Sequence, residues 1–462
     1  MTRILHACVL ASACALAIDV DLVSAQNAPP LRLTVADAVA RGLEASHRLG
    51  EIRARAKGAQ ASVEGAQAAD RPTLNASVGY ARTNHVAEFV VPQPSGTRLV
   101  VYPDIPDNML TRLQFQWPIY TSGRTDALER AERAEAEAVG ADLETARADL
   151  RFEIVRAYWA AVTARETAQV IAESVARAEA QLNDARQRFA VGLIPPNEVS
   201  SLQAQRSREQ AQLIEARNFQ ESTLIELRRL IGVAPETGIA LSDALDVPGS
   251  QVQGFSGSGV QGVQGVQGVQ GSESVVKEAL AQRPERKALN FRIGSAEARE
   301  QAVRATTKPT VAVGSTVDWA NPNAKIFPRQ SAWLNSWDLS VNMNWAVFDW
   351  GRTKAQAATI AAVADAARER LAELDTVVAA DVRQRLLDLS SSFALVQAAS
   401  DAVTSAAEAR RVVGDRFAAG VATSTDVLVA QVALLENGLV RMRALASVKL
   451  AEARLERAVG RP

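Results

Sequence analysis

The sequence has very few of the side chains from which catalytic and metal sites are built. It contains two cysteines and three histidines in 462 residues, and the histidines (His6, His47 and His85) are too scattered for a metal-ligand spacing. Aromatic residues make up 5%, and 52 acidic side chains nearly cancel 51 basic ones. These counts favour no enzyme, metal or cofactor, and no charge-driven binding to nucleic acid.

Residues 1–25 have the features of a secretory signal peptide. Arg3 is followed by an apolar run of about fifteen residues, which is short for a membrane-spanning helix, and a Val-Ser-Ala cleavage signal precedes Gln26. Cleavage there would remove both cysteines, which suits an exported protein without disulfides. The alternatives are a buried N-terminal helix and lipidation at Cys14, although Ala11 stands where a lipidation signal usually has leucine.

The rest of the chain is an internal duplication. Similar segments recur at one constant spacing, here called the downstream offset: RFAVGL at Arg188 with RFAAGV at Arg416, and WPIYTSGRT at Trp117 with WAVFDWGRT at Trp345. Earlier in each half the spacing is larger, as between DAVARGLEA at Asp37 and SVVKEALAQ at Ser274, and is called the upstream offset. One connection in the first half is therefore nine residues longer. Such long-range similarity indicates two structural repeats.

A segment rich in Gly, Val and Gln separates the repeats. It contains four consecutive Val-Gln-Gly triplets, a composition typical of a flexible linker. We therefore expect a first repeat over 26–248, a linker over 249–272 and a second repeat over 273–462.

Each repeat is predicted to contain a helix, a β-hairpin (73–120 and 310–348) and a long helical hairpin (124–232 and 352–460). TLNASVGY and LQFQWPIY alternate apolar and polar residues, and each predicted strand has about the ten residues that a tilted membrane strand needs. Six of the seven tryptophans lie in or beside these hairpins, as in the aromatic girdle of a membrane barrel. The alternative is a four-stranded soluble sheet packed on helices.

The helical segments are long and free of proline. Apolar residues recur at steps of four and seven, as in Leu143, Leu150, Ile154, Tyr158 and Val162, which indicates a coiled-coil seam packed with alanine. Residues 126–189 alone would form a rod of about 95 Å. Gly192 and Gly420 are expected to end such rods, and Pro195-Pro196 to delay the next helix on one side.

Four membrane strands cannot form a closed barrel, because unpaired edges in lipid cost several kcal/mol for each backbone group. Strands from several chains must therefore be combined, and three chains would supply twelve. The same symmetry would gather the long helices into a tube below the barrel. The predicted fold is therefore mostly α, with a membrane β-barrel part shared between subunits.

On these features the chain resembles the TolC-like family of outer membrane factors. The motif after the aromatic strand end, Gly123-Arg124-Thr125 and Gly351-Arg352-Thr353, is similar to that family's barrel–helix junction, and the two R-F-x-x-G segments resemble its hairpin tips. The resemblance implies a homotrimer in the outer membrane with a twelve-stranded barrel, a periplasmic helical tunnel and a small mixed equatorial region. It also implies two partners, a periplasmic adaptor (membrane fusion) protein and an inner-membrane pump, ABC-type or proton-driven.

The resemblance also suggests roles for residues at the tips. Glu198 and Asp426 occupy equivalent positions and would line the periplasmic entrance, with Asn197 and Phe417 closing it. Acidic rings of this kind select cations, although both carboxylates could instead be ordinary caps of helix N-termini. The adaptor would contact the tips at Gly192-Leu193 and Gly420-Val421. Ala422 and Val429 depart from the arginine and the second acidic residue that some members have there.

An export channel is the function that these features favour. The alternatives are a coiled-coil surface or scaffold protein without a lumen, and a periplasmic hydrolase, for which the sequence offers no catalytic constellation. The family serves protein secretion and the efflux of drugs or metals. The missing lipidation signal slightly favours type I protein or toxin secretion, because many drug-efflux members are lipidated. The connections 85–109 and 321–334 are expected to be loops facing the cell exterior.

Overall fold

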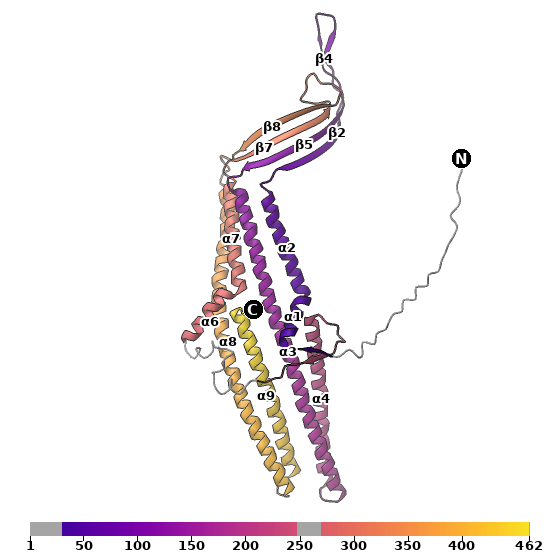
Figure 1. Ribbon diagram of the computed structural model, residues 1–462, viewed down its shortest axis with the longest axis vertical. Coiled ribbons are helices and arrows are strands. Elements are labelled where there is room, and N and C mark those ends of the chain that lie inside the picture. The colour runs from indigo at the N-terminus through magenta and orange to yellow at the C-terminus, as the bar shows by residue number, and fades with distance from the viewer. Residues whose placement is uncertain (1–29, 247–268, 462) are drawn as a thin grey trace, which may run out of the picture.

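A computed structural model describes residues 30–246 and 269–461 of the chain. The molecule is elongated, with a β-sheet at one end and two helical tips at the other (Figure 1). Helices α3 (Arg124–Ala190) and α8 (Arg352–Ala418) have 67 residues each, and α4 (Pro196–Ile231) and α9 (Ser424–Val459) have 36 each. An unbroken helix of the greater length extends about 100 Å. The predicted continuous rods are therefore present, and the two repeats match in helix length.

Small side chains allow these helices to pack closely. Most buried residues of α3 are alanines, and they follow the apolar seam that includes Ile154 and Tyr158. On α1 (Val35–Ala45), a Cβ atom at Gly42 would lie 2.4 Å from Cδ1 of Ile154, so any larger residue at this helix crossing would displace the buried Ile154 side chain. The main hydrophobic core lies at this level, about halfway along the rods.

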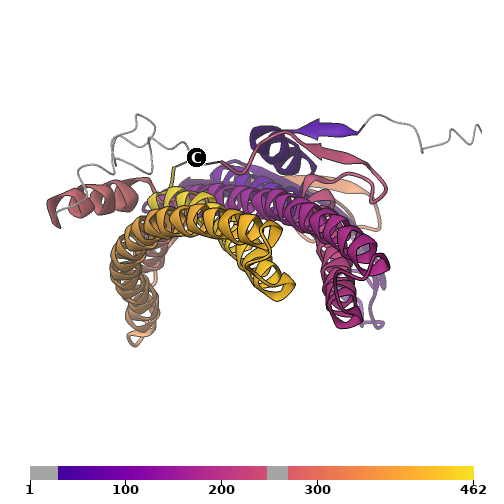
Figure 2. The same cartoon turned by 90° about the horizontal axis from the view of Figure 1, so that it is seen from below.

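The long helices are arranged along an arc. Viewed along the long axis, α3, α4, α8 and α9 curve around an open concave side (Figure 2). Towards the sheet, α2 (His47–Ala68) packs beside α3, and α7 (Pro284–Ala305) packs between α3 and α8. Helices α1 and α6 (Val269–Gln282) lie on the convex side (Figure 2). One chain thus forms a segment of a curved wall.

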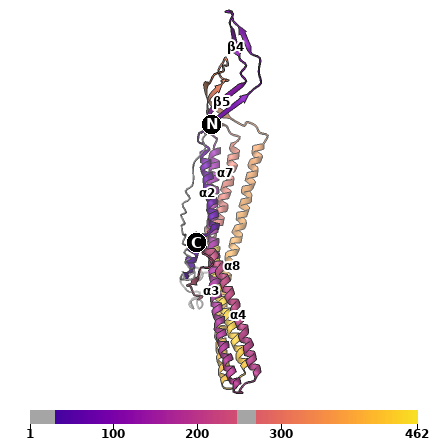
Figure 3. The ribbon, with the colours of Figure 1, turned by 90° about the vertical axis from the view of Figure 1, so that its right-hand side faces the viewer.

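The sheet has four antiparallel strands in the order β2 (Thr73–Arg82), β5 (Asp107–Tyr120), β7 (Thr310–Asn321) and β8 (Leu334–Asn344). Pairing of β5 with β7 joins the hairpin of the first repeat to that of the second, and the sheet continues the helical wall (Figure 3). The prediction of the second hairpin over 310–348 was too long, because β8 ends at Asn344. Residues 345–348 have no strand partner within the described chain.

The connection over residues 85–109 is more ordered than the predicted loop. It contains β3 (Phe89–Pro92) and β4 (Arg98–Tyr102), which form an antiparallel hairpin beyond the end of the sheet (Figure 1). Pro92 is the last residue of β3, where a missing backbone donor is tolerated. The four prolines of this connection indicated a loop, and for that reason the short valine-rich strands were not predicted.

The equatorial region contains a parallel pair of short strands, β1 (Leu31–Leu33) and β6 (Ile239–Leu241). Tyr158 on α3 fastens this pair, because its hydroxyl donates to the carbonyl of Leu33 at 2.9 Å and accepts from the backbone N–H of Asp243 at 3.3 Å. The two strands are very short and lie at opposite ends of the first repeat, so the sequence carries no signal of their pairing.

The linker prediction over 249–272 is wrong at its end. Helix α6 begins at Val269, so residues 269–272 are helical. They form the first turn ahead of the segment in which Val276 and Ala279 are buried against α8, and packing of that face stabilises the turn. The signal peptide and most of the linker lie outside the described residues.

Candidate functional site at the helical tips

Both helical hairpins turn back through the same backbone geometry. Helix α3 ends at Ala190 and α8 at Ala418, and five residues separate each from the following helix. Gly192 and Gly420 have φ angles of +75° and +73°, a left-handed conformation that favours glycine. The helix after the first tip begins at Pro196 itself, since proline suits a first helical position. The expected delay by the two prolines is absent, because both gaps have the same length.

The outermost residues of the tips are apolar and exposed. The side chain of Leu193 is 74% exposed and that of Val421 is 68% exposed. Their backbone N–H groups donate to the carbonyls of Arg188 and Arg416, so the turns that present them are held by hydrogen bonds. The two turns therefore offer equivalent apolar contact points at the far end of the molecule (Figure 1).

Asp426 is the third residue of α9, and its carboxylate caps that helix. Oδ2 accepts from the backbone N–H of Thr423 at 2.8 Å and from its hydroxyl at 2.7 Å, and the hydroxyl oxygen of Thr423 accepts from the N–H of Asp426 at 3.2 Å. These hydrogen bonds from Thr423, aided by the charge of Arg416, hold the pKa of Asp426 below its ordinary value. The side chain is exposed, so the carboxylate caps the helix while it faces solvent.

Glu198 occupies the equivalent position in α4 but lacks the reciprocal cap. The cap residue is Pro195. It has no backbone N–H to donate to the carboxylate of Glu198 and no side-chain oxygen to accept from the N–H of Glu198. Glu198 is half-buried, and Asn197 beside it is exposed, with its backbone carbonyl accepting from the hydroxyl of Ser201 at 2.9 Å. The two acidic positions are thus equivalent in place and different in bonding.

Phe417 contacts the neighbouring hairpin of the same chain. The guanidinium carbon of Arg188 lies 5.1 Å from the centre of the Phe417 ring, a cation–π arrangement that joins the end of α3 to the end of α8. The sequence suggested Asn197 as the residue that closes the entrance together with Phe417, and Arg188 was not identified. The sequence signal for Arg188 was the Arg-Phe dipeptide, which occurs at both tips. Phe189, which is equivalent to Phe417 in the first repeat, is exposed.

At the opposite end, the sheet has one apolar and one polar face. The apolar face is exposed on all four strands, with Val78, Leu113, Trp319 and Val341 as examples. On the polar face, Arg112 of β5 donates to Asp318 of β7 at 2.7 and 3.2 Å.

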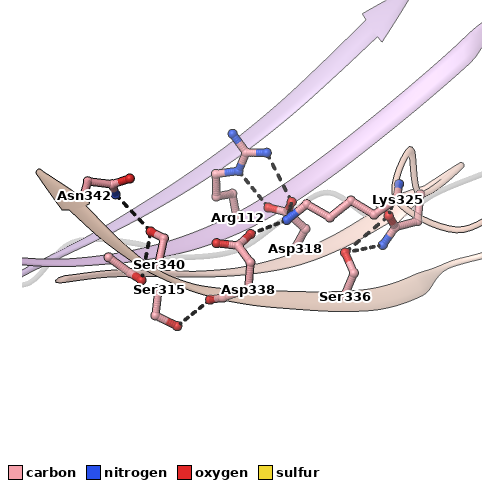
Figure 4. A network of polar contacts seen from close by, with 10 residues as sticks. Arg112, Ser315, Asp318, Lys325, Ser336, Asp338, Ser340 and Asn342 are labelled. Atoms are coloured by element: carbon pink, nitrogen blue, oxygen red, sulfur yellow. Dashed lines mark hydrogen bonds and ion pairs between the residues drawn. The ribbon is translucent and has the colours of Figure 1, made fainter.

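A connecting segment folds over this polar face (Figure 4). From it, Lys325 forms ion pairs with Asp318 and with Asp338 of β8. A hollow of about 370 Å³ lies between the segment and the strands, and both Arg112 and Lys325 line it. The polar network therefore ties the connection over residues 322–333 to three strands of the sheet.

The junctions between sheet and helices are also duplicated. Gly123 and Gly351 cap α3 and α8 with φ angles of +76° and +82°, and Arg124 and Arg352 are the first helical residues. The indole N–H of Trp117 donates to the carbonyl of Asp70 at 3.2 Å, and that of Trp345 donates to Thr307 at 3.1 Å. Both repeats thus leave the sheet by the same turn.

Within the described residues, no group of three or more His, Cys, Asp or Glu side chains could hold a metal ion. The same residues include no helix that is long and apolar enough to cross a membrane.

Residues 39–233 and 275–461, one segment from each repeat, match the model of a protein family described as outer membrane efflux protein. The chain belongs to this family. It is therefore an outer-membrane protein of a family whose description names efflux rather than an enzymatic reaction.

Solved outer-membrane channels have the same fold. The protein is similar to the outer membrane protein VceC of Vibrio cholerae, with 19% identity and a TM-score of 0.74 over 92% of this chain and 96% of that one. It is also similar to the open-state MtrE outer membrane channel of Neisseria gonorrhoeae, with 18% identity and a TM-score of 0.71 over 92% of this chain and 88% of that one.

Among curated proteins, the chain is similar to protein CyaE of Bordetella pertussis, with 26% identity over 248 residues. The match covers 52% of this chain and about half of that relative, 47% of its length.

Proposed function

We propose that three copies of this chain form the outer-membrane channel of a trans-envelope export system. A periplasmic adaptor and an inner-membrane pump would deliver substrates to the helical tips, and the sheets of the three chains would close into the exit barrel. The observation that carries the proposal is the four-stranded sheet with an exposed apolar face, continuous with a curved wall of helices and unpaired at both edges within the described chain. Such edges are too costly in lipid to remain open.

The direct test of the channel is its assembly and conductance. Purified protein in mild detergent should have the mass of a trimer by light scattering and should form pores in planar bilayers. A monomer that forms no pores would refute the proposal and favour a scaffold without a lumen.

Adjacent residues of β8 provide a matched test of which face meets lipid. Val341 is exposed on the apolar face, and Asn342 lies on the polar face that would line the lumen. Val341→Arg should impair membrane insertion, because a lipid-facing arginine costs about 2–4 kcal/mol near the bilayer midplane. Asn342→Arg should insert normally and shift the pore towards anions. The reverse pattern would invert the faces.

The adaptor contact is proposed at the exposed apolar turns of Leu193 and Val421. A double variant with glutamate at both positions should assemble into conducting trimers and lose export, because it places charges in the contact. The conservative double variant Leu193→Met, Val421→Ile should retain export. Equal export by the two variants would place the adaptor elsewhere.

Type I protein secretion is favoured over small-molecule efflux, on the ground that Cys14 lacks the usual lipidation context. A deletion strain should then lose one or more secreted proteins while its susceptibility to drugs and metals stays unchanged. Increased susceptibility with an unaltered set of secreted proteins would favour efflux.

A further inference from the structure

The two edge strands of the sheet belong to different repeats. Within the described residues, β2 pairs only with β5, and β8 pairs only with β7. The proposed trimer requires β8 of one subunit to pair with β2 of another, and the further inference rests on that proposed function. What assembly alone leaves open is the register, that is, which residues face each other.

The duplication of the chain extends to single residue pairs in the sheet. Thr73 faces Gln116 in the first hairpin, and Thr310 faces Asn344 in the second. Thr310 follows Thr73 by the upstream offset of the duplicated sequence, and Asn344 follows Gln116 by its downstream offset. The repeats are therefore equivalent in strand register as well as in order.

Pairing of β5 with β7 shows how one repeat joins the next. In it, Phe115 faces Ser315 and Gln114 faces Thr316. Adding the downstream offset to the number of a residue in β5 gives its equivalent in β8. Subtracting the upstream offset from the number of a residue in β7 gives its equivalent in β2. In a closed ring of equivalent repeats, the contact between the first and second repeats of one subunit must recur between its second repeat and the first repeat of the next subunit.

We propose that β8 pairs antiparallel with β2 of the partner subunit in the register that this equivalence defines. Met343 then faces Val78 of the partner subunit, and Asn342 faces Gly79 of the partner subunit. The first pair lies on the apolar face and the second on the polar face, so both strands keep their faces. A slip of one residue would exchange the faces of one strand.

The early end of β8 is a second observation in favour of this contact. Residues 117–120 of β5 lie beyond the pairing with β2, and Trp117, Pro118 and Tyr120 pair with β7 alone. Their equivalents, residues 345–348, are not in a strand, and no strand within the described residues of the same chain pairs with them. In the proposed register, residues 73–76 of the partner subunit lie opposite, so residues 345–348 extend β8 when the ring closes.

Disulfide trapping tests the register. The described residues contain no cysteine, so the double variant Met343→Cys, Val78→Cys introduces one reactive pair at each subunit contact. Facing residues have Cβ atoms about 4.5–5.5 Å apart, whereas diagonal ones are about 7–8 Å apart, and a disulfide needs about 3.5–4.5 Å. Mild oxidation should therefore give covalent trimers on denaturing gels several-fold faster for this variant than for shifted ones.

The matched controls pair Met343→Cys with Ala76→Cys or Tyr80→Cys, which shift the register by two residues and keep the face. Faster trapping in either control would overturn the proposed register. The register would also be overturned if none of the variants gave covalent trimers although their reduced forms assemble into conducting trimers. Absence of trimers and pores in the unmodified protein would instead refute the proposed function.

Hydrogen exchange on the unmodified protein gives an independent readout that needs no variant. Backbone amides within 345–348 should exchange several-fold more slowly in trimers than in detergent-dissociated monomers. Equal exchange in the two states would show that β8 is not extended and would also overturn the proposed register.

Discussion

Arg112 and Asp318 form a two-point ion pair across the strands that join the two repeats. Nε donates to one carboxylate oxygen at 2.7 Å and a terminal nitrogen donates to the other at 3.2 Å. Asp318 is buried beneath the segment that carries Lys325, and it contacts both Arg112 and Lys325, while Asp338 provides a second carboxylate for Lys325. In the proposed barrel this face lines the lumen, and the network would set the charge of the exit.

Asp318→Asn should make the pore less cation-selective. The substitution removes one negative charge from each subunit and leaves Arg112 and Lys325 facing the lumen, so the reversal potential in a salt gradient should shift towards anions. Asn342→Ser, on the same face, changes no charge and should leave the reversal potential unaltered. An unshifted potential in Asp318→Asn would mean that this face is not in the conduction path.

The β3–β4 hairpin should be exposed on the cell exterior, because it projects from the sheet end opposite the helical tips (Figure 1). A Ser95→Cys variant should react with a membrane-impermeant maleimide on intact cells. Thr425→Cys, in an exposed position beside the second tip, should react only after permeabilisation of the outer membrane. Labelling in the opposite order would reverse the topology.

Tyr158→Phe should loosen the equatorial region without affecting the sheet or the tips. The variant removes the hydroxyl that bonds Leu33 and Asp243, and losing such hydrogen bonds costs about 1 kcal/mol each. Protease cleavage near β1 and β6 should therefore become faster, while pore conductance stays the same. Unchanged cleavage would show that the strand pair is held by other contacts.

The same tyrosine predicts a pH dependence. Burial, and then the interaction with the side chain of Asp243, raises the pKa of Tyr158 to about 12 from an ordinary value of 10.0. A raised pKa means that its stabilising effect is complete below about pH 10 and is lost as the pH rises towards about 12. Protease resistance should fall across that window in the parent protein and should vary less in Tyr158→Phe.

The sequence allowed good prediction of the features that repeat or extend over many residues. The absence of proline and the apolar seam through Ile154 and Tyr158 predicted the α3 rod, because a helical pattern becomes unambiguous over long segments. Strict alternation likewise predicted all four sheet strands. The constant downstream offset then identified the equivalent tips at Gly192 and Gly420.

Features that depend on a distant partner could not be predicted. The β1–β6 pair contacts the hydroxyl of Tyr158 on the distant helix α3, and nothing within either short strand indicates the pairing. The contact between Arg188 and Phe417 joins residues of different repeats whose only signal was a repeated dipeptide. The end of β8 at Asn344 was misjudged because alternation continues through Val347, whereas a strand also needs a neighbour to bond with.

The cation–π contact predicts that Arg188 and Phe417 act together in closing the entrance. Phe417→Ala and Arg188→Ala should each raise the resting conductance, because an exposed contact of this type contributes about 0.5–1 kcal/mol. The double variant should resemble either single one, since each change already removes the shared interaction.

Arg186→Ala is the charge-matched control for Arg188→Ala. Its side chain is exposed two residues earlier on α3, so its loss should leave the resting conductance unchanged. Additive effects of Arg188→Ala and Phe417→Ala would show that the two residues act independently. A response to Arg186→Ala equal to that of Arg188→Ala would attribute the effect to charge alone.

Asp426 and Thr423 allow the capping role to be separated from the role in an acidic entrance ring. Thr423→Ala removes the cap, at a cost of about 0.5–2 kcal/mol, and leaves the carboxylate in place. Cation selectivity should therefore persist in this variant although the tip is less stable. Asp426→Asn removes the charge and should lower both cation selectivity and block by multivalent cations from the periplasmic side.

The pH dependence of selectivity decides which influence dominates at Asp426. Its pKa lies below the ordinary value of 3.8 because Thr423 and Arg416 stabilise the charged form. At any pH above that ordinary value, Asp426 is therefore charged and its cap is intact. Both are lost only as the pH falls through the lowered pKa. Selectivity measured between pH 8 and pH 5 should therefore be constant, since Asp426 stays ionised throughout this range. A decline that begins near pH 6 and disappears in Asp426→Asn would instead show that repulsion between the three carboxylates, together with their desolvation in the entrance, outweighs the cap, because both raise the pKa of a carboxyl group.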